Sequence, residues 1–185
     1  EHSIILVKEL REKETADEID RIAKTIEETL NAETNSRVYI SSGTIVSDLK
    51  DVSRSYKEAK MALEVGKIFE TDKYIVNYEK LGIGRLIYQL PLPLCRMFIK
   101  EVLHGLTMDD FDDETLATVN KFFENNLNVS ETSRQLYIHR NTLVYRLDKL
   151  QKMTGLDLRN FDDAIIFKIT LMVSKYMIYM DKMAY

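Results

Sequence analysis

The chain has 185 residues, of which 45% are hydrophobic and 30% charged, and its formal net charge is −4. This length allows one large domain or two small ones, and the composition is that of a globular protein and not of a disordered or fibrous chain. Six glycines and two prolines are too few for long low-complexity linkers. The overall charge does not indicate a nucleic-acid-binding protein, so local charge must decide that question.

The chain contains one cysteine, Cys95, which rules out an intramolecular disulfide framework and fits a reducing compartment. Cys95 lies in an apolar stretch, which indicates a buried structural thiol and not a nucleophile. No secretory signal is visible, and two lysines interrupt the most apolar stretch, 164–180, so we expect a cytoplasmic protein without a membrane span. The first residue is Glu and not Met, so we expect a fragment of a longer protein.

In the first half of the chain, short apolar runs alternate with amphipathic helical patterns. Strands and helices are predicted in turn over 3–8, 15–30, 37–43, 51–65 and 74–78. Gly66 is expected to end the helix over 51–65, because glycine is a common helix stop. This order predicts an α/β-type unit of about 80 residues.

Beyond Leu81 the alternation of strand and helix patterns ends, and two prolines, Pro91 and Pro93, break the local pattern. Helices are predicted over 96–104, 114–126 and 161–179, and no strand is indicated. The acidic run 109–114 leads into the second of these helices, where acidic side chains favour the helix dipole. A calcium loop would need a glycine inside such a run, and there is none, so no metal site is predicted.

Two short helical patterns, 130–136 and 140–150, flank a three-residue break. Ser130 is a suitable N-cap for the first pattern, and Ile138 in the break can fill the corner between the helices. One face of the second pattern is apolar and must pack on the rest of the domain, through Leu143, Leu147 and Leu150. The opposite face and the first turn carry the polar residues that a DNA-recognition helix needs, namely Arg140, Asn141, Thr142, Tyr145, Arg146 and Lys149.

The local charge agrees with DNA binding. Residues 130–152 contain five Lys or Arg and two acids, a net charge of +3, so the acidic surplus of the chain lies elsewhere. Any amphipathic helix pair with a solvated basic face would show the same pattern. Spacing and charge alone therefore leave both interpretations open.

A resemblance to a known family favours DNA binding. The contiguous stretch His-Arg-Asn-Thr-Leu (139–143), Tyr-Arg-Leu (145–147) and Thr-Gly-Leu-Asp-Leu (154–158) resembles the C-terminal helix-turn-helix of PucR/CdaR-type bacterial transcriptional regulators. The resemblance covers residues 110–175 and implies double-stranded DNA as the partner. The family usually has alanine at Ser133, where a buried serine can bond to the helix backbone and so changes packing more than function.

The resemblance also implies which residues contact DNA. Six motif positions are carried over as contacts: His139, Arg140, Asn141, Thr142, Tyr145 and Arg146. Three further residues complete the set that we predict: Ser130, Thr132 and Lys149.

The first half of the chain resembles a domain that often precedes this helix-turn-helix, a degenerate GGDEF-like domain. Residues 1–8 resemble the strand after its signature loop, 38–43 a later strand and turn, and 55–66 the terminal helix. The loop itself is absent, with Glu1 at most its remnant, which implies that the chain begins inside the domain. The expected fold is therefore an α+β part, a partial GGDEF-like sheet with helices, followed by an all-α helix-turn-helix domain.

Catalysis is not predicted. Cyclic-dinucleotide synthesis needs a carboxylate-held metal and backbone groups that cradle phosphates, whereas this chain has neither a Gly-rich loop nor a suitably placed carboxylate pair. The three histidines, His2, His104 and His139, are too scattered for a zinc site. We therefore predict no enzyme activity, no metal and no cofactor.

The sequence predicts a partial GGDEF-like domain over 1–85, a connecting helical segment over 86–104 and a helix-turn-helix domain over 105–185. The predicted function is regulation of a catabolic operon, with a small-molecule effector sensed by an upstream domain. A homodimer is expected, because one short helix binds DNA weakly and two copies can read a symmetric site.

Two alternatives remain at this point. One is a non-catalytic nucleotide- or protein-binding regulatory module that acts through the GGDEF-like part, which calorimetry with nucleotides would test. The other concerns an apolar stripe that is either a dimer surface or part of the core, formed by Ile165, Ile169, Met172, Tyr176 and Tyr179.

Overall fold

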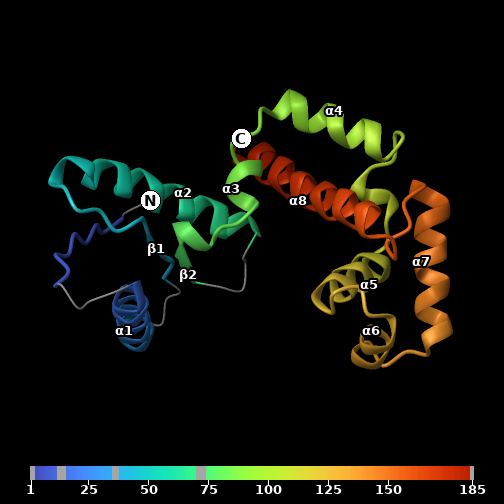
Figure 1. The fold of residues 1–185 in the computed structure, drawn as a ribbon, viewed down its shortest axis with the longest axis horizontal. Coiled ribbons are helices and arrows are strands. Elements are labelled where there is room, and N and C mark those ends of the chain that lie inside the picture. The colour runs from blue at the N-terminus through green and yellow to red at the C-terminus, as the bar shows by residue number, and fades with distance from the viewer. Residues whose placement is uncertain (1–2, 12–15, 35–37, 70–73, 184–185) are drawn as a thin grey trace. The chain divides into compact units, whose positions relative to one another are not determined.

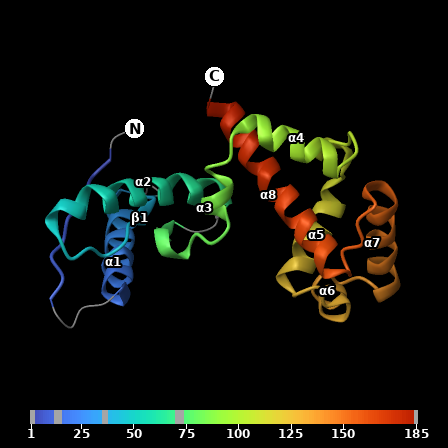
Figure 2. The same ribbon diagram turned by 45° about the horizontal axis from the view of Figure 1, so that its top comes forward.

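The computed structural model describes residues 3–11, 16–34, 38–69 and 74–183. The chain divides into two compact units, Glu1–Tyr88 and Gln89–Tyr185, which Figure 1 and Figure 2 show in two orientations. The first unit combines a small sheet with helices, and the described part of the second is helical, so the predicted fold class is confirmed.

The first unit is built around two parallel strands and the helix that joins them. Its elements are α1 (Ala16–Thr34), β1 (Ile40–Ser42), a 3₁₀ turn (Leu49–Asp51), α2 (Val52–Phe69), β2 (Ile75–Asn77), a second 3₁₀ turn (Tyr78–Lys80) and α3 (Gly84–Ile87). Ile40 pairs with Ile75 in the sheet, and α2 packs against both strands, as a parallel crossover requires. The buried core of this unit includes Ala62, Val65, Val76 and Leu81.

The strand predicted over 3–8 is wrong. Residues 3–11 have no regular secondary structure, and within the described residues the sheet contains only β1 and β2. The side chain of Ile4 is 96% exposed. An apolar run becomes a strand only where a neighbouring strand satisfies its backbone groups. The predicted strand over 37–43 is confirmed in its centre, and its residue 37 lies outside the described residues.

Gly66 does not end its helix, because α2 continues to Phe69. The glycine is buried against β2, and a Cβ atom added to it would lie 2.6 Å from Val76 Cγ2. Gly66 therefore allows α2 to approach β2 closely. The glycine that was predicted to end the helix is explained by this packing and not by a helix stop.

We expect Gly43→Ala to destabilise the first unit. A Cβ atom added to Gly43 would lie 2.0 Å from the carbonyl oxygen of Ser55, and a backbone atom cannot rotate away. Overpacking of this kind costs about 1–3 kcal/mol. Faster amide hydrogen exchange over the first unit would measure the loss, with Lys57→Ala on the exposed side of α2 as a control. Unchanged exchange would contradict the close contact.

The second unit contains the remaining helices: α4 (Leu92–Val102), a 3₁₀ turn (Met108–Asp110), α5 (Asp113–Glu124), α6 (Val129–Gln135), α7 (Arg140–Thr154) and α8 (Phe161–Met183). Pro91 is the N-cap of α4 and Pro93 lies in its first turn, where proline is tolerated, so this helix starts earlier than predicted. α4 packs along α8 (Figure 1; Figure 2). The segment 86–104, expected as a connection, thus contributes a helix to the second unit.

The core of the second unit lies between α5, α7 and α8. Phe122 and Phe167 are its largest fully buried side chains, and Phe111 packs edge-to-face on Phe167 with ring centroids 5.9 Å apart. On α8, Tyr176 is buried and donates a hydrogen bond to the carbonyl oxygen of Leu90 at 3.3 Å, so this member of the predicted stripe belongs to the core.

Cys95 is buried, and burial raises the pKa of its thiol, as expected for a structural cysteine. In the described parts of the chain, the helices all lack the combination of length and apolarity that a membrane crossing needs.

Candidate nucleic-acid interface

The first helix of the predicted pair is α6, and its N-cap is Asn128 and not Ser130. The side-chain oxygen of Asn128 accepts a hydrogen bond from the backbone N–H of Glu131 at 3.0 Å. Ser130 lies in the first turn, where its side chain is exposed. Serine and asparagine are almost equally good caps, so sequence alone does not choose between two such residues so close together.

The turn between α6 and α7 is as predicted. Ile138 is half-buried against the core, and its backbone N–H donates to the carbonyl oxygen of Ser133 at 3.0 Å. Tyr137 has a φ of +55°, so one left-handed residue reverses the chain. The hydroxyl of Ser133 donates to the carbonyl oxygen of Ser130 at 3.0 Å, which confirms the expected bond to the helix backbone.

α7 begins with a side-chain cap and ends with a glycine. Nδ1 of His139 accepts a hydrogen bond from the backbone N–H of Asn141 at 3.2 Å. Gly155 has a φ of +78° and ends the helix, which is four residues longer than predicted. The leucines of the predicted apolar face, Leu143, Leu147 and Leu150, are all buried.

The outer side of α7 presents polar groups to solvent. Arg140, Asn141 and Thr142 are exposed in its first turn, next to the exposed His139. Tyr145, one turn further along, is 69% exposed. The arrangement therefore leaves a guanidinium, an amide, a hydroxyl and an aromatic ring free to meet a ligand.

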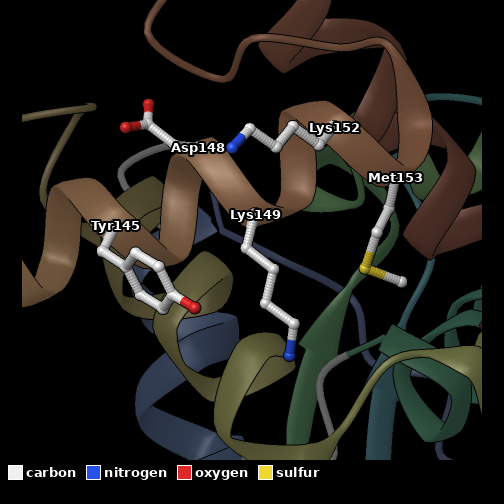
Figure 3. A pocket seen from close by; sticks show the side chains of 5 residues that line it. All are labelled: Tyr145, Asp148, Lys149, Lys152 and Met153. Atoms are coloured by element: carbon white, nitrogen blue, oxygen red, sulfur yellow. The ribbon is translucent and has the colours of Figure 1, made fainter.

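The second half of α7 adds two lysines to this outer side. Figure 3 shows the five side chains that line a pocket on α7: Tyr145, Asp148, Lys149, Lys152 and Met153. The Lys149 ammonium lies 3.1 Å from the Asp112 carboxylate, and the Lys149 side chain is 48% exposed. Lys152 is exposed and was missing from the predicted contacts, although it lies three residues after Lys149 and so on a neighbouring part of the helix surface.

Thr132 and Arg146 are not on this exposed surface. Thr132 is fully buried, and among the described residues its hydroxyl has no hydrogen-bond partner, so it is inaccessible to DNA in this structure. The Arg146 side chain is 17% exposed and forms an ion pair with Glu114 and a 2.9 Å hydrogen bond to Thr118 Oγ1. Thr132 is therefore a correction to the predicted contact set, whereas Arg146 contacts α5 in this structure.

The acidic segment before α5 caps that helix, as expected from its sequence. The carboxylate of Asp112 accepts a hydrogen bond from the backbone N–H of Thr115 at 2.7 Å. The side chain and backbone of Thr115, together with the ammonium of Lys149, lower the pKa of Asp112 to about 2. This carboxylate thus connects the start of α5 to α7.

The depressed pKa of Asp112 predicts a pH-dependent contribution to stability. The contribution of Asp112 to the free energy of unfolding is fully present above its ordinary pKa of 3.8. It is lost as the pH falls through the folded-state pKa of about 2. Asp112→Asn keeps a good N-cap and removes the charge. We expect the wild type and this variant to differ in thermal midpoint above pH 3.8 and to converge towards pH 2. A difference that stays constant over this pH interval would contradict the assignment.

The connection between α7 and α8 is held by Arg159. Its guanidinium lies 2.9 Å from the Asp148 carboxylate of α7 and 2.7 Å from the Asp157 carboxylate of the connection. Leu158, which lies between Asp157 and Arg159 in the sequence, is buried in the core of this unit. The Thr-Gly-Leu-Asp-Leu-Arg stretch (154–159) thus ends α7 and fixes the path to α8.

Two family models match the chain. The model of the PucR C-terminal helix-turn-helix domain matches residues 115–173, from α5 into α8. The model of the GGDEF-like domain matches residues 1–65 in the first unit.

Several characterised regulators are similar to this chain. The purine catabolism regulatory protein of Bacillus subtilis (strain 168) is 28% identical over 71% of this chain and 25% of its own length. The carbohydrate diacid regulator of Escherichia coli (strain K12) is 31% identical over 75% of this chain and 36% of its own length. The proline-responsive transcriptional activator PutR of B. subtilis is 28% identical over 75% of this chain and 34% of its own length.

The chain spans no more than about a third of the length of these three relatives. Among solved structures, a regulator of polyketide synthase expression from Bifidobacterium adolescentis is 23% identical, with a TM-score of 0.37 over 66% of this chain and 50% of that chain. The two domain types occur here in the predicted order, first the GGDEF-like domain and then the helix-turn-helix. The chain therefore combines a GGDEF-like domain with a helix-turn-helix domain of the PucR C-terminal type, and it is similar to regulators of the PucR/CdaR type.

Proposed function

We propose that the second unit binds double-stranded DNA through α7 and that the chain acts in transcriptional regulation. The observation that carries this proposal is the exposed first turn of α7, which follows a helix and a tight turn and presents Arg140, Asn141 and Thr142. In helix-turn-helix proteins the start of the second helix enters the major groove.

Each exposed side chain has a chemistry that suits a part of the duplex. Arg140 can donate two hydrogen bonds to guanine, and Asn141 can bond both edge atoms of adenine. Thr142 and Ser130 can donate to phosphate oxygens, and Tyr145 offers a further hydroxyl. Further contacts to the negatively charged backbone would come from Lys149 and Lys152, and His139 would position the start of the helix beside the bases.

The regulated genes and the signal are inferred from the relatives. Two of them are named as regulators of purine catabolism and of carbohydrate diacids, and a third as proline-responsive. We propose by analogy that this protein controls a catabolic operon in response to a small molecule, without enzyme activity of its own. A cytoplasmic location and a homodimer on a symmetric DNA site belong to the same proposal.

Selection from a randomised duplex pool tests the proposed function. The full chain should enrich a defined sequence and bind it more tightly than a scrambled duplex of the same length. Affinity should fall steeply as salt rises, because bound phosphates release counterions. If no sequence is enriched and no duplex is bound in a salt-dependent way, the proposal is wrong.

A further inference from the structure

We propose that Arg146 is a positioning residue, which holds the recognition helix α7 on α5 and does not contact DNA. This inference rests on the proposed function, because it assigns a role within the same DNA-binding unit. It reassigns a residue that its motif position suggested as a contact.

The geometry around Arg146 supports a role inside the protein. Its guanidinium spans two residues one turn apart on α5, with one nitrogen paired to the Glu114 carboxylate and another 2.9 Å from Thr118 Oγ1. Thr118 is itself buried and donates a hydrogen bond to the carbonyl oxygen of Glu114 at 2.8 Å. The planar fork of arginine suits two partners at once, whereas the ammonium of lysine is a single point charge.

The position of Arg146 on α7 explains why it points towards α5. It lies three residues after Leu143 and four before Leu150, and residues at these spacings share one side of a helix. Both leucines are buried. Arg146 therefore emerges at the border of the buried face, whereas the neighbouring Tyr145 faces outwards and is 69% exposed.

If the Arg146 side chain turned from α5 to a DNA phosphate, it would lose its interactions with both Glu114 and Thr118. Thr118 is 1% exposed, so water cannot readily replace the guanidinium at its hydroxyl. The charge of Arg146 is also balanced by Glu114. By contrast, Arg140 has only a 3.4 Å contact with Ser130 Oγ on an exposed surface, and it can turn to a duplex at little cost.

The salt dependence of binding separates positioning from contact. Each neutralised phosphate contributes about 0.9 to the slope of log affinity against log salt concentration. We expect Arg146→Gln in the full chain to weaken binding of the selected duplex on the order of tenfold with an unchanged slope. Lys152→Gln, which removes an exposed lysine proposed to contact the DNA backbone, should weaken binding and reduce the slope by about 0.9. Lys100→Gln on the exposed side of α4 removes the same charge and should change neither quantity.

A double-mutant cycle with Thr118→Val tests whether Arg146 acts through α5. Thr118 is buried, so this variant cannot remove a DNA contact. Thr118→Val should weaken binding in the wild-type background and have little further effect beside Arg146→Gln. Arg146→Lys should restore only part of the affinity. Circular dichroism would verify that each variant is folded.

The proposal is overturned if Arg146→Gln reduces the salt slope as Lys152→Gln does, if it leaves the affinity unchanged, or if its effect adds to that of Thr118→Val. If the wild type binds no duplex at all, the proposed function fails. In that case the same cycle, measured by thermal unfolding, decides whether Arg146 holds α7 on α5. Additive effects on unfolding would then refute the positioning role.

Discussion

Replacing Arg140 by alanine is expected to weaken binding of the selected duplex by on the order of ten- to a hundredfold. A bidentate contact from arginine to guanine is worth about 1–3 kcal/mol of discrimination, and a factor of ten corresponds to about 1.4 kcal/mol. Arg140 is exposed in the first turn of α7 and makes no close ion pair among the described residues, so little is lost within the protein itself. Fluorescence anisotropy with the full chain would measure the change.

The Arg140→Ala experiment needs a control for net charge. Lys100→Ala makes the same change of charge on α4 and should leave the affinity within error of the wild type. The selected duplex and a scrambled duplex should also be bound more nearly alike by Arg140→Ala. Equal losses for the two alanine variants would show that overall charge, and not α7, governs binding.

The largest effect on stability is expected for Phe167→Ala. Phe167 is fully buried on α8 and packs edge-to-face against Phe111, with 78° between the rings. Removing a buried phenylalanine ring costs about 3–5 kcal/mol, because burial is lost and a cavity remains. Chemical denaturation, followed by hydrogen exchange over the second unit, would measure the loss.

Phe161→Ala is the matched control for Phe167→Ala. It makes the same substitution on the same helix, but Phe161 is 68% exposed. We expect its effect on the free energy of unfolding to be within about 0.5 kcal/mol. Similar losses in the two variants would mean that the second unit does not pack as described.

The helix-turn-helix was predictable from sequence because its signals are local. Leu143, Leu147 and Leu150 recur at helical spacing, and their burial follows directly from that pattern. The end of α7 was misplaced because the leucine pattern stops at Leu150, whereas the helix continues to its stop at Gly155. Gly155 is a local helix-stop signal, but the predicted helix end followed the last leucine of the pattern instead.

The two wrong predictions in the first unit, the strand over 3–8 and the helix stop at Gly66, have a different origin. Whether the run 3–8 forms a strand depends on a partner strand, and whether Gly66 ends a helix depends on Val76 of β2. Both outcomes depend on contacts with other secondary-structure elements and not on the local sequence. Hydrophobic periodicity and glycine statistics carry no information about such contacts.

The two predicted DNA contacts that do not lie on the exposed surface of the helix pair, Arg146 and Thr132, differ in how far sequence could have placed them. Arg146 could have been recognised from its spacing to Leu143 and Leu150, which places it beside the buried face. Its partners Glu114 and Thr118, about thirty residues earlier on α5, could not have been identified from spacing. The burial of Thr132 likewise depends on how α6 packs on its neighbours.

The most direct test of the account is a nuclear magnetic resonance titration of the full chain with the selected duplex. We predict that backbone amide signals of residues 139–142 and 145 shift most strongly, with smaller changes elsewhere in α7. Signals from Glu1–Tyr88 should change little. Strong shifts confined to that first unit, or an α7 that stays unchanged at saturating duplex, would contradict the claim that α7 is the DNA-binding element.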